Sequence, residues 1–340
     1  MSRRKPKISL GLPVYNGALF LRETLESVLQ QTYGDFELII SDNASTDHTE
    51  DICREFANQD QRICYQRLET NLGAVANFNR LIGLASGEYY KWVAADDICL
   101  PSFLAATLEL IESDPHLVWV HSAFGKVDQH GTVLDQDDAA AEGLAHSSQA
   151  GHPRVHHDAA ARHKRFRGVL LGTTWCADIY GLIRKSVLDK TRPLPACYGA
   201  EKVLLGELAL WGRYRQVPET LFYQRVHSSA AGELATREQQ EAYVTPERKN
   251  QKKRFGQARF DLLKGHLRAV KNVPMSVTDR GLCWWVIAQY LGQVSKWPDL
   301  LRSEWLRAPI RRPISAPARS TRSPAVDLPV PPQRPEPRKT

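Results

Sequence analysis

Four short apolar segments alternate with segments of helical periodicity in the first third of the chain, and this alternation limits the fold more than any other feature. Apolar runs bounded by polar residues predict buried strands, and the spacing of the apolar residues between them predicts helices with one buried face. Repeated strand and helix units build a mostly parallel sheet covered by helices, so the sequence predicts an α/β protein. The predicted strands are Ile8 to Val14, Phe36 to Ser41, Ile63 to Leu68 and Tyr89 to Val93.

The pattern changes after the next predicted strand, Leu117 to Val127. Residues 135–165 carry few large apolar side chains, which predicts a mobile surface loop over the active-site end of the sheet. The five histidines of this segment lack the regular spacing of a metal site, so a solvated loop is the better interpretation. Further along, the sequence predicts strands at Tyr180 to Ile183, Tyr214 to Val217 and Leu221 to Val226, and a helix at Ala200 to Leu210.

The net charge of +7 is concentrated at the C-terminus. From Arg302 onward nine basic residues accompany three acidic ones, so the rest of the chain is nearly neutral. A neutral body disfavours nucleic-acid binding, which needs a concentration of Lys and Arg on one face. Residues 308–340 are rich in proline, arginine and serine without apolar periodicity, and this composition predicts a disordered tail.

The cysteines and the N-terminus indicate a cytoplasmic protein. None of the six cysteines forms a CxxC pair, and several lie among apolar residues where a reduced thiol packs as a core side chain. The apolar stretch after Lys7 is interrupted by Pro13 and Asn16, which argues against a signal peptide. The longest apolar run, Leu282 to Leu291, contains Gln289 and is shorter than the ~20 residues that span a bilayer, so we expect no transmembrane helix.

Polar motifs follow the predicted strands, at the edge of the sheet where a ligand is expected. Parallel α/β sheets bind ligands in the crevice beyond the carboxyl ends of their strands. No GxGxxG sequence follows the first strand, which removes the main evidence for a nicotinamide enzyme. The motifs at the four strand ends are Pro13-Val14-Tyr15-Asn16-Gly17, Ser41 to Asp47, Asn71-Leu72-Gly73 and Ala95-Asp96-Asp97.

The motifs PVYNG, SDNASTD, NLGAVANFN and ADD, in this order at the strand ends, resemble those of family 2 glycosyltransferases. The resemblance covers about Lys7 to Ser228. It implies the GT-A nucleotide-diphospho-sugar transferase fold in residues 7–232, followed by a helical appendage in residues 233–307. It also implies inverting, hexosyltransferase-like transfer of a sugar from a nucleotide-diphospho-sugar to a hydroxyl of a carbohydrate or lipid-linked acceptor, in glycan, polysaccharide or glycolipid synthesis.

The resemblance assigns the donor nucleotide to the first three strand ends. A carboxylate at a strand end can accept a hydrogen bond from the N–H of a nucleotide base, and by resemblance this carboxylate belongs to Asp42. Capping of the helix near Thr46 is the structural alternative for Asp42, and a plain turn is the alternative for the third strand end. The other residues assigned to the donor nucleotide are Pro13, Tyr15, Asn16, Asn71, Gly73 and, beside the metal, Asp96.

A divalent cation, Mg²⁺ or Mn²⁺, is expected because a departing nucleoside diphosphate carries negative charges that a hard cation held by carboxylates can neutralise. The expected carboxylates are those of Asp96 and Asp97. Related sequences carry Asp-x-Asp, and Ala94 here replaces the first Asp, which leaves open which carboxylate contacts the metal directly. By resemblance, His227 would complete the metal shell and Arg225 would face the diphosphate. The alternatives are an Asp pair that caps the next helix and a structural histidine.

Glu201 opens a predicted helix and resembles the family position whose carboxylate deprotonates the acceptor hydroxyl, although Asp is the commoner residue there. A base is needed because an alcohol is a poor nucleophile until its proton begins to leave. The alternative is a first-turn carboxylate favoured by the helix dipole. Trp175 and Asp178 lie where related enzymes contact the acceptor or the sugar, and core packing is the alternative for Trp175.

The C-terminal region interleaves aromatic residues with Lys and Arg, a composition suited to an anionic membrane surface. Packing of these helices back onto the catalytic domain is the alternative. The residues concerned are Trp284, Trp285, Tyr290, Trp297 and Trp305 with Lys296, Arg302, Arg307, Arg311 and Arg312.

Two other functions remain open at this stage. Ala94 in place of Asp, and Lys202 beside Glu201, are compatible with a catalytically inactive nucleotide-sugar-binding module. A sugar nucleotidyltransferase would need a cationic phosphate-binding loop after the first strand, and Pro13 to Gly17 contains no cation.

Overall fold

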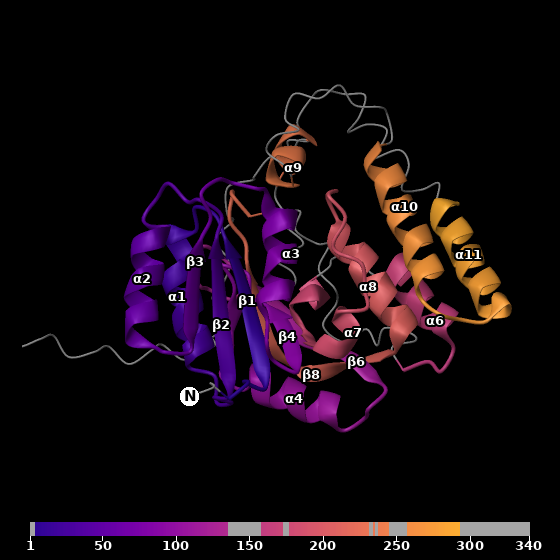
Figure 1. Cartoon of the computed structure of the whole chain (residues 1–340), viewed down its shortest axis with the longest axis horizontal. Coiled ribbons are helices and arrows are strands. Elements are labelled where there is room, and N and C mark those ends of the chain that lie inside the picture. The colour runs from indigo at the N-terminus through magenta and orange to yellow at the C-terminus, as the bar shows by residue number, and fades with distance from the viewer. Residues whose placement is uncertain are drawn as a thin grey trace, which may run out of the picture.

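The computed structural model describes residues 4–134, 158–172, 177–230, 234, 237–244 and 257–292. Residues 135–157 of the predicted loop, Trp175 and the predicted tail of residues 308–340 lie outside the described residues. Over the described residues the chain forms one central sheet with helices on both faces and a further helical layer at one side (Figure 1).

The sheet has eight strands in the order β3-β2-β1-β4-β7-β6-β8-β5. The strands β3, β2, β1 and β4 are parallel neighbours, and β6 is parallel to β8. Only the short β7 and β5 run antiparallel to their described neighbours, so the predicted mostly parallel α/β sheet is confirmed. The strands are β1 Ile8–Val14, β2 Phe36–Asp42, β3 Ile63–Arg67, β4 Tyr89–Trp92, β5 Ile98–Cys99, β6 Leu117–Val127, β7 Leu182–Arg184 and β8 Arg213–Arg225.

The alternation of side chains along the strands divides the core into two layers. Leu38 and Ile40 of β2 pack into the layer that contains α1, α2 and α4, whereas Ile39 packs into the layer that contains α3 and α8. The helices are α1 Ala18–Leu29, α2 Thr49–Gln59, α3 Ala74–Leu84, α4 Phe103–Glu112, α6 Arg162–Arg167, α7 Lys185–Leu188, α8 Ala200–Trp211, α9 Arg237–Val244, α10 Gln257–Asn272 and α11 Val277–Leu291, with short helical turns at Gly168–Gly172 (η1) and Ala177–Tyr180 (η2).

Three predicted boundaries were wrong. The two strands expected at residues 214–217 and 221–226 are one strand, β8, because the pairing with β6 steps over Pro218 and Glu219 as an irregularity and then continues. Residues 177–180 form the helical turn η2, and the strand begins at Leu182. The predicted loop ends early, since α6 begins at Arg162 and buries Phe166.

A third apolar cluster joins α10 and α11 to α6 and α8. Tyr290, which the sequence grouped with the membrane-facing aromatics, is buried in this cluster, so that part of the interpretation was wrong. Within the described residues, no helix is both long and apolar enough to cross a membrane. The described cysteines Cys53, Cys64, Cys99, Cys197 and Cys283 are free thiols.

His266 of α10 is fully buried at the centre of this cluster, and neither ring nitrogen has a hydrogen-bond partner among the described residues. Its ring packs edge-on against Phe166 and Tyr290, with centroids 6.1 and 5.7 Å away. Burial, assisted by the positive charge of Lys202, lowers the pKa of His266 to about 3. The imidazole is therefore a neutral core side chain that joins three helices.

Acidification should destabilise the fold through His266. The unfolded chain binds a proton near pH 6.5 while the folded chain does not, so stability is lost as the pH falls below 6.5, by about 2 kcal/mol between pH 6.5 and 5. His266→Leu removes this contribution, and the change in unfolding free energy between pH 7 and 5, measured by urea titration, should shrink by about 2 kcal/mol. An unchanged pH dependence in the variant would show that the folded state accepts the proton.

Candidate active site

A pocket of about 600 Å³ opens at the carboxyl ends of the central parallel strands. It receives residues from the ends of β1, β2, β4 and β8, from α3 and from α9, so segments far apart in the sequence share one wall. Of the residues predicted from sequence, those that line it are Pro13, Tyr15, Asn16, Asn71, Asp96, Asp97, Arg225 and His227.

Asparagine side chains join the loops that follow β1, β2 and β3 at the pocket. The Asn43 side-chain amide donates to Asn71 Oδ1 at 2.9 Å and accepts from the backbone N–H of Leu72, also at 2.9 Å. Asn16 joins the first loop to the second, because its Oδ1 accepts from the N–H of Thr46 at 2.8 Å. Asn43, which the sequence did not single out, is therefore the link between the second and third loops.

Backbone conformation explains the residue types in these loops. Asn16 and Ala44 adopt positive φ angles of 52° and 62°, and Gly73 adopts 86° at the start of α3. Asparagine tolerates the left-handed region and glycine adopts it freely, whereas alanine does so at a cost. Gly73 itself does not line the pocket, and its positive φ gives it a conformational role at the start of α3. Its contact with the nucleotide stays a prediction.

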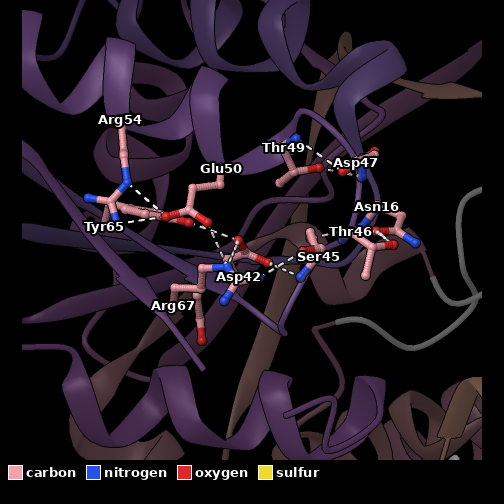
Figure 2. Close-up of polar contacts among 12 residues, drawn as sticks. Asn16, Asp42, Ser45, Thr46, Asp47, Thr49, Glu50, Arg54, Tyr65 and Arg67 are labelled. Carbon is pink, nitrogen blue, oxygen red and sulfur yellow. Dashed lines mark hydrogen bonds and ion pairs between the residues drawn. The ribbon is translucent and has the colours of Figure 1, made fainter. Parts of the chain in front are cut away.

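Asp42 is fully buried and does not line the pocket. Its carboxylate accepts from the N–H of Ser45 at 2.8 Å and from the Tyr65 hydroxyl at 2.8 Å, and the guanidinium of Arg67 lies 3.6 Å away (Figure 2). Arg67 is held by Glu50 at 2.9 Å. The following helix α2 begins at Thr49, so Asp42 holds the loop before the helix and does not cap it. Contact of Asp42 with a base stays a prediction that requires Tyr65 or Arg67 to move aside.

Asp96 and His227 form the polar centre of the pocket. His227 Nε2 lies 3.0 Å from Asp96 Oδ2, although the two residues are 131 positions apart in the sequence. The His227 ring also packs against Phe20, with centroids 4.6 Å apart. A carboxylate and an imidazole converge here on the same open space.

Asp97 is buried beside this pair and has a different environment. Its Oδ1 accepts from the backbone N–H of Arg225 at 2.9 Å, and its carbonyl accepts from the Thr24 hydroxyl at 2.9 Å. Burial, together with the charge of Asp96, raises the pKa of Asp97 well above its usual value. Asp97 therefore anchors the motif, and Asp96 is the more accessible of the two carboxylates.

The Arg225 guanidinium is directed into the protein. Nε donates to the carbonyl of Asp96 at 2.9 Å, Nη2 pairs with Glu23 at 2.6 Å, and the group lies 4.8 Å from the centre of the Phe20 ring. Only 1% of the side chain is exposed. Arg225 thus positions the Asp96 and Asp97 motif, and its predicted contact with the diphosphate finds no support in this geometry.

Removing the Arg225 side chain should destabilise the protein far more than removing an exposed arginine. Arg225→Met leaves buried carbonyls and the Glu23 carboxylate without their donor, so we expect the unfolding free energy to fall by about 3 kcal/mol in urea titrations. Arg22→Met is the matched control, because Arg22 and Glu55 form an exposed ion pair, and its loss should cost less than about 1 kcal/mol. Equal losses in the two variants would contradict this assignment.

Glu201 occupies the first turn of α8, which follows Gly199 in the left-handed conformation. It is not part of the pocket lining, but its charge acts on Tyr180 and Tyr243, which do line the pocket. Burial raises the pKa of Glu201 above its ordinary value. A carboxyl group with these properties suits a general base near the pocket.

Tyr243 was not predicted from the sequence. It lies on α9, near no motif along the chain, and enters the pocket only because α9 packs against α3. Asp178, the weak acceptor candidate, is buried 3.6 Å from His121 and does not line the pocket. Trp175 lies outside the described residues.

The described residues at the pocket supply only some of the ligands that a divalent cation needs. Among the described residues, no group of three or more His, Cys, Asp or Glu side chains is arranged to hold a metal ion. Asp96 and His227 nevertheless supply one carboxylate oxygen and one imidazole nitrogen within 3.0 Å of each other. Mg²⁺ and Mn²⁺ in nucleotide sites commonly take one or two protein ligands and complete their shell with phosphate oxygens and water.

Solved structures support the fold. The S. aureus TarS fragment of residues 1–349 has a TM-score of 0.59 with this chain at 15% identity, over 89% of this chain and 75% of the fragment. The mannosyltransferase PcManGT from Pyrobaculum calidifontis, in complex with GDP-Man and Mn²⁺, has a TM-score of 0.50 at 16% identity, over 89% of this chain and 88% of that protein. These similarities confirm the predicted GT-A fold.

Curated relatives agree at the level of sequence. The putative teichuronic acid biosynthesis glycosyltransferase TuaG of Bacillus subtilis is 32% identical over 146 residues, which are 43% of this chain and 58% of TuaG. The uncharacterized glycosyltransferase MJ1057 of Methanocaldococcus jannaschii is 32% identical over 39% of this chain and 46% of its own length. The uncharacterized glycosyltransferase alr2836 of Nostoc is 28% identical over 66% of both chains. The chain thus matches about half of the length of the first two relatives.

The family model described as glycosyl transferase family 2 matches residues 9–190, more than half of the chain. This span contains the four strand-end motifs and the Asp96 and Asp97 pair, and ends before α8. The protein belongs to glycosyl transferase family 2.

Proposed function

We propose that the protein transfers a sugar from a nucleotide-diphospho-sugar to a hydroxyl acceptor, with inversion at the anomeric carbon. The proposal rests on one observation. The loops joined by Asn16, Asn43 and Asn71 line the same pocket of about 600 Å³ as the Asp96 and His227 pair. This volume suits a ligand of the size of a nucleotide sugar. The solved complexes of TarS with UDP and of PcManGT with GDP-Man and Mn²⁺ give the proposal further support.

The chain's residues divide the work in this proposal. The loops around Asn16, Asn43 and Asn71 hold the nucleotide, with Tyr15 half exposed at the pocket wall as a surface for the base. Asp96 and His227 would hold a divalent cation, which neutralises charge on the leaving diphosphate when bound. Arg225 keeps Asp96 and Asp97 in position through its hydrogen bonds to both residues.

The acceptor enters from the side of α8 and α9. Glu201 takes the proton of the acceptor hydroxyl, the acceptor oxygen bonds to the anomeric carbon, and the nucleoside diphosphate departs from the opposite side. A positioned base of this kind contributes about 10²–10⁴-fold to the rate. The raised pKa of Glu201 brings its basicity nearer to that of a base that works at neutral pH. A carbohydrate or a lipid-linked molecule provides the hydroxyl.

Donor binding and hydrolysis test the proposal directly. UDP-, GDP- and dTDP-sugars are titrated into the protein with Mn²⁺ or Mg²⁺, and the released nucleoside diphosphate is measured. We expect one nucleotide to bind well and to be hydrolysed slowly in a metal-dependent way. Binding of a donor with no turnover in the presence of any carbohydrate or lipid-linked acceptor supports an inactive module instead, and absence of binding throughout the panel contradicts the proposal.

A further inference from the structure

The outward face of α11 is apolar. Cys283, Val286, Ile287 and Tyr290 form its buried side. On the opposite side Val277 is 90% exposed, Trp284 55% and Trp285 63%, and Ala288 is also exposed. Adjacent exposed tryptophans mark a surface that contacts something else. No described element covers this face.

The neighbouring helix α10 carries a basic stripe. The exposed side chains of α10 recur at helical spacing and so lie on one face. Three of these exposed side chains are cationic, two are apolar and none is acidic. The side chain of Lys264 lies over the Phe260 ring, 4.4 Å from its centre. The members of the stripe are Phe260, Lys264, Leu267, Arg268 and Lys271.

Both surfaces lie on the outer side of the same helical layer. The buried side of α10 packs against α8, the buried side of α11 packs against α6, and the two helices pack against each other. Figure 1 shows them side by side at the edge of the molecule, remote from α1 and α2. The apolar face of α11 and the basic stripe of α10 are therefore neighbouring parts of one exterior surface, called here the α10–α11 face.

We propose that the α10–α11 face docks on an anionic lipid surface. Tryptophan rings are suited to the headgroup region of a bilayer, and lysine and arginine beside them pair with acidic headgroups. The sequence after α11 has the same character, with Trp297 and Trp305 among basic residues and an excess of six positive charges from Arg302 onward. This excess of positive charge opposes pairing with a second copy of the face and favours a negatively charged partner.

The proposal is independent of the sugar-transfer chemistry, because none of the residues on the α10–α11 face lines the pocket. If both proposals hold, the docked enzyme works at a surface where lipid-linked acceptors reside. Substitutions on the face should therefore change membrane binding without changing donor binding.

Vesicle sedimentation of the full chain tests the proposal. We expect the protein to sediment with vesicles of phosphatidylcholine and phosphatidylglycerol and to remain in solution with phosphatidylcholine alone. Trp284→Ser combined with Trp285→Ser should weaken binding at least about 10-fold. Lys264→Gln combined with Arg268→Gln should weaken it about 30-fold, since each cation near the surface contributes about fivefold.

A matched control removes two cations from the opposite end of the molecule. Lys5→Gln combined with Arg22→Gln lowers the net charge by the same amount and should leave binding within about twofold. Thermal melts show whether each variant folds, which is expected because every substituted side chain is at least partly exposed. The proposal is overturned if the wild-type protein does not sediment with anionic vesicles. It is also overturned by undiminished binding by the tryptophan variant, or by a concentration-dependent dimer that the tryptophan variant abolishes.

Discussion

Glu201→Gln should lower kcat of sugar transfer by about 10²–10⁴-fold while the KM for the donor stays nearly constant. The amide has almost the same shape as the carboxyl group but cannot accept a proton from the acceptor hydroxyl. Because the pKa of Glu201 is raised, the wild-type rate should fall on the acid side at a pH above the ordinary range of a glutamate, as the base becomes protonated. The variant should lack this acid limb. Steady-state kinetics from pH 5 to 8 measure both effects.

Glu207→Gln is the matched control on the same helix. Glu207 is buried and accepts from the Asn272 side chain of α10 and from the N–H of Arg192, and it does not line the pocket. This substitution should lower stability while kcat stays within about twofold. If Glu201→Gln keeps more than a tenth of the wild-type kcat, another group accepts the proton.

Asp96→Ala should raise the concentration of Mn²⁺ needed for half-maximal activity at least about 10-fold and lower kcat/KM by about 10³. The geometry favours Asp96 as the direct ligand because its carboxylate faces the pocket next to His227, whereas that of Asp97 is buried against the Arg225 backbone. His227→Ala should have a smaller effect, about 10-fold, since water can replace one neutral ligand of a hard cation. Calorimetric titration of Mn²⁺ in the presence of UDP or GDP measures the affinity separately from the rate.

Asp97→Asn provides the comparison that decides between the two carboxylates. The amide oxygen can still accept from the Arg225 N–H, so the motif should keep its shape and the Mn²⁺ affinity should fall less than in Asp96→Ala. A larger loss of affinity in Asp97→Asn would reverse the assignment. Equal Mn²⁺ affinity in Asp96→Ala and wild type would exclude Asp96 as a metal ligand.

The strand-end motifs allowed much of the pocket to be predicted. Parallel strands end at one edge of the sheet, so residues such as Asn16, Asn71 and Asp96, each next to a strand end, must lie near one another once the sheet forms. β1 and β6 have the predicted bounds because apolar residues recur along the whole of both strands and are buried there. The strand predicted at Tyr180 to Ile183 begins instead at Leu182, because an aromatic side chain such as that of Tyr180 suits a strand and a helical turn alike.

The directions of charged side chains were not predictable in this way. By resemblance Arg225 was expected to face the diphosphate, and its guanidinium instead pairs with Glu23 and donates to the Asp96 carbonyl. Likewise the Asp42 carboxylate already accepts hydrogen bonds from the Ser45 N–H and the Tyr65 hydroxyl. A long or charged side chain can satisfy its hydrogen bonds in several directions, and only the packed neighbours select one of them.

The sequence by itself determined the parallel α/β sheet, the order of its strand-end motifs and the membership of those motifs in one site, because these depend on periodicities and turns encoded over a few residues. Only the tertiary structure decided that Tyr243 enters the pocket, and that Trp284 faces outward while Tyr290 is buried. Each of these outcomes depends on how elements distant in sequence pack together, and that packing is set by the complementary shapes of whole helix and sheet surfaces.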